Sequence, residues 1–314
     1  MKKLTIAIST YNRVAKLKNT LAYHLSGLDK FEHLEIDFLI VDNCSTDTTW
    51  TYLNSVNFND QKIKIYRNDF NVGMLGNLAV VSSLARSEFI WILGDDDYIN
   101  FKYLDQIYNS LTKDVTYLNY SSSIDLDLES QIESSSFTKY RTQEPRVSKT
   151  GVYKLSQVAT ANNNLFTSIY SLITKTSLAV EIFSNIPSSK YFSNLNSCVP
   201  TVNYLLTLPS TTEVFWHAEE CVLVDLNVSW MEFAPWWILE RIPEIAVSWI
   251  ERGADKSQMS EFIQSYVPSF AHFADVAINE KLEINSTYLK LALKEISEDI
   301  DIQSIVMRLE NNAK

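Results

Sequence analysis

Three consecutive carboxylates, Asp95, Asp96 and Asp97, follow the apolar run of the stretch "FIWILGDDDYIN" at residues 89–100. Like charges this close raise one another's pKa, and each tenfold loss of acidity corresponds to about 1.4 kcal/mol. The chain already carries a net charge of −11, which makes a further knot of negative charge unfavourable. A divalent cation would relieve it, because Mg²⁺ and Mn²⁺ bind one or two carboxylates and complete their shell with phosphates. The alternative is a solvated turn, or a cap for a helix predicted over 98–111.

The composition narrows the class of protein. The chain has 38 acidic residues against 27 basic ones, an excess that disfavours nucleic-acid binding, which needs a basic face for phosphates. Zinc is disfavoured because no cluster of Cys and His accompanies the acids. Cys44, Cys198 and Cys221 are scattered and odd in number, without metal-ligand or disulfide spacing, so we expect a reducing compartment.

The N-terminal stretch "MKKLTIAIST" contains an apolar run that is too short for a signal peptide or for a membrane span. No transmembrane stretch stands out elsewhere in the chain. We therefore expect a cytoplasmic protein, and we leave open a peripheral contact with the inner face of a membrane.

Strands and helices alternate along the first third of the chain. Apolar runs predict strands over 4–9, 35–43 and 88–97, and an alternating pattern predicts a strand over 62–69. Helical spacing lies between them over 13–29, with Leu17, Leu21 and Leu25, and over 76–87. This alternation predicts an α/β fold with a mostly parallel sheet and helices on both faces. Polar clusters follow three of the strands, namely "STYNR", "VDNCSTD" and "GDDD". Because ligands bind at the carboxyl ends of parallel strands, we expect these clusters to converge.

The rest of the chain is less regular. The Ser-rich segment 121–150 predicts a long loop or an exposed hairpin, 165–177 and 213–230 predict strands, and 199–208 predicts a helix. From residue 235 the pattern is helical, and Gly253 fits the end of one of these helices. We interpret 235–314 as a C-terminal helical appendage.

Four stretches together resemble glycosyltransferase family 2, whose members have the GT-A (Rossmann-like) fold: "ISTYNR", "VDNCSTDTT", "RNDFNVGMLGN" and "FIWILGDDDYIN". They stand in the order and spacing of the family and cover about residues 1–110. The stretch "LNVSW" at 226–230, with the aromatic helix after it, is also similar to bacterial surface-polysaccharide members, including abequosyltransferase-like ones. The resemblance implies a nucleotide-sugar-binding half over 1–115, an acceptor-binding half over 116–234 and the appendage over 235–314.

The resemblance implies an inverting transfer of a sugar from a nucleotide-sugar to an acceptor hydroxyl in capsule or O-antigen synthesis. The donor would be a UDP-, dTDP- or CDP-sugar, and the acceptor a glycan or a lipid-linked glycan. Bound Mg²⁺ or Mn²⁺ would stabilise the charge that develops on the leaving diphosphate.

The family's roles fall on individual positions of this chain. Thr10, Tyr11 and Arg13 would line the nucleotide pocket, with the Tyr11 ring stacking on the base and the Arg13 fork binding phosphate. Asp42 would accept a hydrogen bond from the ring N–H of a pyrimidine base. Gly94 occupies the position where the family's metal motif often has its first Asp, so we expect the acids after it to bind the metal. The resemblance assigns Asp97 and Asp96 to the metal, and Gly73, Asn77, Asp95 and Asp96 to the nucleotide.

The general base is the least defined part of the site. An inverting transfer needs a group that removes the proton of the acceptor hydroxyl, and the family commonly takes it from an acidic pair before a helix. The comparable segment here, 192–206, contains no carboxylate. We take Glu220 as the candidate base and Asp96 as a further catalytic residue. The alternatives are His217, Glu219 and Asp225, a base from the Ser-rich segment, or an inactive homologue.

The stretch "SWMEFAPWWIL" at 229–239 holds three of the seven tryptophans. Such a cluster is typical of a core at a domain junction, or of an aromatic platform for a sugar or a lipid-linked acceptor. The amphipathic helices after it favour helix packing, including packing in a homodimer, because the negative net charge disfavours anionic lipid. Two rival functions remain. The first is a nucleotidyltransferase, which the segment "STYNR" disfavours because it lacks the Gly-rich basic loop that grips phosphates. The second is a sugar-nucleotide-binding or glycan-binding module without a catalytic base.

Overall fold

The computed structural model describes residues 3–56, 63–111, 115–124, 147–159, 168–184, 192–198, 200–225, 231–296 and 300–312. The chain divides into two compact units. The first comprises Met1–Tyr153, Asn162–Ile186 and Glu213–Asn227, and the second comprises Lys154–Ala161, Pro187–Thr212 and Val228–Lys314. The boundaries expected at 115 and 234 stay predictions.

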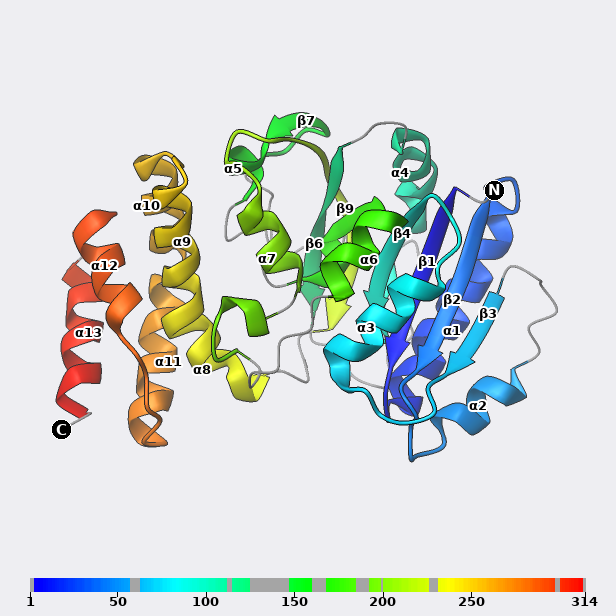
Figure 1. Cartoon of the computed structure of the whole chain (residues 1–314), viewed down its shortest axis with the longest axis horizontal. Coiled ribbons are helices and arrows are strands. Elements are labelled where there is room, and N and C mark those ends of the chain that lie inside the picture. The colour runs from blue at the N-terminus through cyan, green and yellow to red at the C-terminus, as the bar shows by residue number, and fades with distance from the viewer. Residues whose placement is uncertain are drawn as a thin grey trace. The chain divides into compact units, whose positions relative to one another are not determined.

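A mixed sheet forms the centre of the first unit. In the described residues it has nine strands, in the order β3-β2-β1-β4-β8-β6-β9-β5, with β7 paired to β9. Figure 1 shows β3, β2, β1 and β4 side by side. The first four strands of this order are parallel, whereas β8 and β5 run antiparallel to their neighbours. The α/β fold predicted from the sequence is confirmed. The strands are β1 Leu4–Thr10, β2 Ile36–Asp42, β3 Ile63–Arg67, β4 Phe89–Gly94, β5 Asp97–Ile99, β6 Thr116–Ile124, β7 Gly151–Lys154, β8 Leu172–Lys175 and β9 Glu213–Asp225.

Helices cover both faces of this sheet. On one face α3 packs against α6, and on the other α1 and α4 contribute leucines and an isoleucine to the main core (Figure 1). The helices of this unit are α1 Val14–Leu28, α2 Thr49–Ser55, α3 Gly73–Leu84, α4 Leu104–Ser110 and α6 Thr176–Ser184.

The burial of each strand follows its place in the sheet. All seven residues of β2 are buried, as are six of the seven in β1, because these parallel strands are covered on both faces. The first strand in the order, β3, instead alternates between half-buried and exposed residues. This is why the first, second and fourth strands could be predicted from apolar runs alone.

Two sequence predictions are wrong in detail. The helix expected over 98–111 begins later, because Tyr98 and Ile99 belong to β5 and pair with Leu223 and Val222 of β9. A short 3-10 helix, η2 Phe101–Tyr103, then leads into α4. The long loop or exposed hairpin predicted over 121–150 has a different start as well, because residues 121–124 belong to β6. Residues 125–146, and "LNVSW" at 226–230, lie outside the described residues.

The second unit is helical. Trp237 is 2% exposed, and its ring lies 5.7 Å from the ring of Phe192, which fits the core interpretation of the aromatic cluster. Trp230 lies outside the described residues. No helix in the described part of the chain is long and apolar enough to span a membrane. The helical segments are α5 Leu155–Val158, α7 Pro200–Thr207, α8 Ala234–Trp236, the π-helical η8 Trp237–Arg241, α9 Ile242–Glu251, α10 Lys256–Ser265, α11 Val267–Asn279, α12 Thr287–Glu295 and α13 Ile300–Asn312.

Candidate functional site

Three strand ends bring the predicted polar clusters together. Strand β1 pairs with β2 on one side and with β4 on the other, so that Thr10 lies opposite Asp42 and Ser9 lies opposite Gly94. The clusters that follow these strands therefore share one edge of the sheet. The predicted convergence is confirmed.

The three carboxylates lie where the chain turns from β4 into β5, and basic side chains of α1 and its N-cap meet two of them. The Nε of Arg13 lies 3.0 Å from Oδ1 of Asp95, and the same guanidinium contacts Asp96. The Nζ of Lys16 lies 3.2 Å from Asp96. Thr10 donates a hydrogen bond of 2.6 Å to Asp95. Arg13, assigned to phosphate from the sequence, thus has two carboxylates as its partners.

Asp97 differs from the other two acids. It is 3% exposed, and one of its oxygens accepts a hydrogen bond of 2.6 Å from the backbone N–H of Gly94. Burial, and then the charge of Asp96, raise the pKa of the Asp97 carboxyl well above its ordinary value. Burial also raises the pKa of Asp95 to about 6, although Arg13 acts in the opposite direction. Asp97 is therefore the carboxyl whose negative charge the basic side chains match least.

Gly94, which precedes the three carboxylates, has a steric reason to be a glycine. A Cβ on Gly94 would lie 3.0 Å from Oδ1 of Asp96 and 3.1 Å from Oδ2 of Asp97. Both separations are tighter than ordinary van der Waals contact. Gly94 thus allows both carboxylates to lie close against the end of β4, where a side chain would push them away.

The donor set at this turn fits a hard divalent cation. One or two carboxylates, completed by phosphates and water, are the usual protein share of a Mg²⁺ shell. Asp96 and Asp97 supply such oxygens, and the second oxygen of Asp97 accepts no hydrogen bond from the described residues. No group of three or more His, Cys, Asp or Glu in the described ranges could hold a metal ion by itself. A cation here would therefore take its remaining ligands from water and from the phosphates of a bound molecule.

Hydrogen bonds of Asn12 connect the loop after β1 to the loop after β2. Its backbone N–H donates to Ser45 Oγ at 2.8 Å, and its Oδ1 accepts from the backbone N–H of Thr46 at 2.7 Å. Asn12 has a φ of +53°, a region that asparagine tolerates better than most residues. Tyr11, the residue before it, is 39% exposed, so its ring is accessible to a stacking partner.

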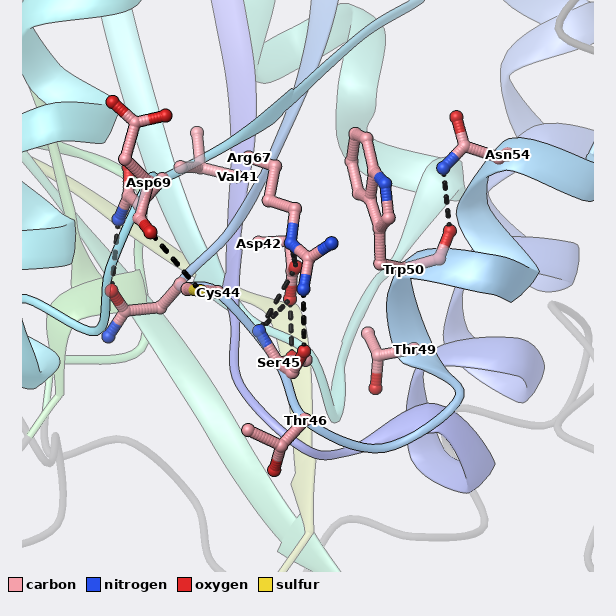
Figure 2. A network of polar contacts seen from close by, with 12 residues as sticks. Val41, Asp42, Cys44, Ser45, Thr46, Thr49, Trp50, Asn54, Arg67 and Asp69 are labelled. Carbon is pink, nitrogen blue, oxygen red and sulfur yellow. Dashed lines mark hydrogen bonds and ion pairs between the residues drawn. The ribbon is translucent and has the colours of Figure 1, made fainter.

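Asp42 is completely buried at the end of β2. Both of its oxygens accept hydrogen bonds from Ser45, and the Nε of Arg67 lies 3.3 Å from Oδ2 (Figure 2). Arg67 also donates to the carbonyl of Ser45 at 2.8 Å, and its guanidinium lies 5.5 Å from the centre of the Trp50 ring. The contact of Asp42 with a base stays a prediction, and the structure adds Arg67 and Trp50 beside it.

Gly73 and Asn77 belong to a second polar network on the same edge. Asn77 donates to Ser9 Oγ at 2.6 Å and accepts from Asn68 Nδ2 at 2.9 Å. Gly73 begins α3 with a φ of +77°, and its carbonyl accepts from Asn43 at 3.2 Å. These contacts place both residues at the site edge, while their role with a nucleotide stays a prediction.

Glu220, the candidate base, lies away from the acidic turn. Strands β5 and β9 are antiparallel, and Asp97 lies opposite Val224. Glu220 precedes Val224 by four residues, which is roughly 13 Å along a strand. It is also buried, at 6% exposed. Asp225, by contrast, ends β9 directly after Val224.

The other two alternatives have internal roles. His217 is fully buried, burial lowers its pKa to about 4, and its Nε2 lies 3.1 Å from Ser110 Oγ. Glu219 accepts hydrogen bonds from Thr150 and Gln106. Neither residue lies at the acidic turn.

Two basic residues of the site escaped the sequence analysis. Lys16 follows Arg13 by three residues at the start of α1, a spacing that puts both side chains on one helix face. Arg67 ends β3, next to the end of β2. A search for basic residues beside each polar cluster could have found both.

Comparisons with known proteins agree with this geometry. The family described as "Glycosyl transferase family 2" matches residues 5–158. Abequosyltransferase RfbV of Salmonella typhimurium is 36% identical over 98 residues, 30% of this chain and 28% of RfbV. The Escherichia coli UDP-Glc:alpha-D-GlcNAc-diphosphoundecaprenol beta-1,3-glucosyltransferase WfaP is 30% identical over 123 residues, 38% of this chain and 47% of WfaP. The chain thus matches less than half the length of these two curated relatives.

Solved structures share the fold. S. aureus TarS 1-349 is 15% identical, with a TM-score of 0.59, and the match covers 99% of this chain and 88% of TarS. TarS structures include complexes with UDP-GlcNAc and with UDP. The mannosyltransferase PcManGT from Pyrobaculum calidifontis, solved with GDP-Man and Mn²⁺, is 12% identical with a TM-score of 0.54, over 99% of this chain and 86% of its own. The match over residues 5–158, together with the GT-A fold, identifies a glycosyl transferase family 2 domain in this chain.

Proposed function

We propose that this chain is an inverting glycosyltransferase that moves a sugar from a pyrimidine-nucleotide donor to the hydroxyl of a glycan or a lipid-linked glycan. The setting we propose is bacterial capsule or O-antigen synthesis in the cytoplasm, at the inner face of the membrane. The names of the two relatives, an abequosyltransferase and a glucosyltransferase, support this class of reaction. The observation that carries the proposal is the acidic turn at the shared edge of β1, β2 and β4.

The donor's nucleotide would occupy the edge formed by the first three polar loops. The exposed ring of Tyr11 is suited to stacking on a base, and Asp42 with Arg67 offers a hydrogen-bonding pair beside it. The complexes of TarS with UDP and UDP-GlcNAc support a nucleotide-sugar donor. The side chains of Arg13 and Lys16 would then lie near the diphosphate, since they already contact the acidic turn.

Asp97 and Asp96 would hold Mg²⁺ or Mn²⁺ together with the diphosphate. When bound, the ion supplies Lewis-acid stabilisation of the charge on the leaving group. The buried position of Asp97 limits competition from water, and the N–H of Gly94 fixes one of its oxygens. Mn²⁺ in the complex of PcManGT supports this cofactor class.

An acid at the carboxyl end of β9 would take the proton of the acceptor hydroxyl. Asp225 fits this role better than Glu220, because only Asp225 neighbours the residue that pairs with Asp97. A base must come within about 3 Å of the proton that it removes. Contact with a membrane and assembly as a homodimer stay predictions.

A donor screen tests the proposal. Purified protein with Mn²⁺ is incubated with UDP-, dTDP-, CDP- and GDP-sugars one by one, and release of the nucleoside diphosphate is followed. We expect release from one pyrimidine-linked donor. Binding without release would favour the module that lacks a base, and release of pyrophosphate from a nucleoside triphosphate would favour a nucleotidyltransferase.

Asp97→Asn is the matching variant, with Asp105→Asn as its control because Asp105 is exposed and pairs with His33. Asp97→Asn should weaken Mn²⁺-dependent binding of the nucleoside diphosphate by at least about tenfold in calorimetric titration. Asp105→Asn should leave that affinity unchanged. Equal affinities for both variants would remove Asp97 from the metal site.

A further inference from the structure

One face of α1 contacts the acidic turn and then the short strand β5 that follows it. Arg13 and Lys16, at the start of the helix, contact the carboxylates of the turn. One turn further along, the hydroxyl of Thr20 donates to the backbone carbonyl of Asp95 at 2.8 Å. Residues three and four apart share a helix face, so these three residues lie on one face of α1. The first two bind side chains of the turn, and the third binds its backbone.

The next two residues on this face bind both backbone groups of Ile99. The Tyr23 hydroxyl donates to the carbonyl of Ile99 at 2.7 Å, and the N–H of Ile99 donates to Nε2 of His24 at 3.2 Å. Strand β5 is the last in the sheet order and pairs with β9 on one side. The two side chains of α1 therefore occupy the hydrogen-bonding groups that an edge strand leaves open.

His24 is a neutral acceptor in this contact. It is fully buried among aromatic rings, including Tyr98 and Phe101, and burial lowers its pKa to about 3. Because Nε2 accepts the N–H of Ile99, the ring hydrogen is on Nδ1, which has no hydrogen-bond partner in the described residues. His24 thus accepts the hydrogen bond of the Ile99 N–H, while its own Nδ1–H stays without a partner in the described residues, which lowers the free energy of unfolding.

Close packing continues beyond this pair. A Cβ on Gly27 would lie 2.1 Å from the ring of Phe101, so α1 and the segment after β5 approach as closely as a glycine allows. Strand β5 has only three residues, and the first of them is Asp97. Its position is consequently set from one side by β9 and from the other by α1.

We propose that Tyr23 and His24 are positioning residues that hold β5 in place and thereby fix the carboxylate of Asp97 for a divalent cation and the diphosphate of a ligand. The proposal rests on the proposed function for the identity of the ligand. The clamp itself consists of two hydrogen bonds to Ile99, two residues after Asp97. Metal ligands need placement within about 0.5 Å, so loosening this edge is enough to weaken the site.

Tyr23→Phe removes one bond of the clamp, and Tyr117→Phe is its matched control. Tyr117 donates a comparable bond of 2.9 Å to the carbonyl of Ser110, away from the acidic turn. Hydrogen exchange on the full chain needs no ligand. We expect exchange over 95–99 to accelerate about fivefold in Tyr23→Phe and to stay unchanged in Tyr117→Phe, since a hydrogen bond contributes about 1 kcal/mol. Equal exchange over 95–99 in the two variants would overturn the clamp.

His24→Leu and His24→Gln test the second bond. Glutamine retains an acceptor for the N–H of Ile99, whereas leucine does not. In calorimetric titration with UDP and Mn²⁺, His24→Leu and Tyr23→Phe should bind about three- to tenfold more weakly, and His24→Gln should recover most of the affinity. Wild-type affinity in both Tyr23→Phe and His24→Leu would refute the positioning role. Failure of the wild-type chain to bind any pyrimidine nucleotide with Mn²⁺ would instead refute the proposed function, and hydrogen exchange would then decide the clamp alone.

Discussion

The Nε of Arg13 lies 3.0 Å from Oδ1 of Asp95, and this ion pair is the first of three that join α1 and its N-cap to the acidic turn. The turn has three carboxyl groups and the helix start supplies two cations, so one carboxyl is left without a basic partner among the described residues. Asp97 is that residue, because it has a hydrogen bond from Gly94 and a raised pKa. The protein thus neutralises most of the turn by itself and leaves one buried carboxyl for an additional cation.

Lys16→Gln should tighten the binding of Mn²⁺ alone. The Nζ of Lys16 lies 3.2 Å from Asp96, and its removal takes away a positive charge that would repel Mn²⁺ from that carboxylate. A partly exposed pair of this kind is worth up to about 1 kcal/mol, which corresponds to about a fivefold change. Mn²⁺ titration followed by electron paramagnetic resonance measures it. Lys18→Gln, an equal change of charge on the same helix beside Tyr52, is the control; weaker binding in Lys16→Gln would contradict the competition.

Gly94→Ala should disturb the carboxylates of the turn. The new Cβ would lie 3.0 Å and 3.1 Å from oxygens of Asp96 and Asp97, so at least one carboxylate must move. We expect Mn²⁺-dependent nucleotide affinity to fall by about tenfold, and stability to fall by about 1–3 kcal/mol. Calorimetric titration and urea unfolding measure the two effects. Gly151→Ala is the control, because its nearest neighbour would lie at 3.6 Å; the same losses there would show that the effect is unrelated to the turn.

The sequence predicts the parallel part of the sheet well because each of its strands carries local information. Strands β1, β2 and β4 are buried apolar runs that end in polar clusters, and the order of these clusters already implies a common edge. The short β5 carries no such information. Tyr98 and Ile99 look like the start of a helix, and only pairing with Leu223 and Val222, far along the chain, makes them a strand.

The sequence predicts which residues belong to the site better than it predicts which side chains those residues contact. Arg13 and Asp42 were both named from the sequence, but their contacts depend on side chains that approach from other elements. Arg13 meets Asp95 across the sheet edge, and Asp42 meets Arg67 from the neighbouring strand. His24 illustrates the limit on α1, where the apolar spacing names only Leu17, Leu21 and Leu25, whereas the structure also buries His24 completely and leaves Leu25 partly buried against the core.

Asp42→Asn should reduce the preference for pyrimidine over purine nucleotides. The variant removes the charge that holds Arg67 at 3.3 Å and leaves the shape of the side chain unchanged. Affinities for UDP and GDP with Mn²⁺ are compared by calorimetric titration, and we expect UDP to lose at least about tenfold more than GDP. Asp37→Asn, on the same strand but paired with Lys64 at the opposite end, is the control. Equal losses for both nucleotides would contradict a role in base selection.

His24 should make the protein less stable as the pH falls. Burial lowers the pKa of His24 to about 3, whereas the unfolded chain titrates near 6.5. Below about pH 6.5 the unfolded state therefore binds a proton that the folded state does not, and stability falls by up to about 1.4 kcal/mol per pH unit. Urea unfolding between pH 4 and 7 should show a shallower slope for His24→Gln than for the wild type. An unchanged slope in His24→Gln would contradict this role of His24.

Asp225→Asn should abolish sugar transfer, whereas Glu220→Gln should change it less than about threefold. Asp225 follows Val224, the residue opposite Asp97. Glu220 instead precedes Val224 by roughly 13 Å along β9. Loss of a general base lowers kcat by about a hundredfold or more, and the affinity for the donor should persist because Asp225 is assigned no contact with the nucleotide. Initial rates with the donor found in the screen, together with UDP affinity, separate chemistry from binding. Full activity in Asp225→Asn with an inactive Glu220→Gln would return the base to Glu220 and require the acceptor to approach β9 near its middle.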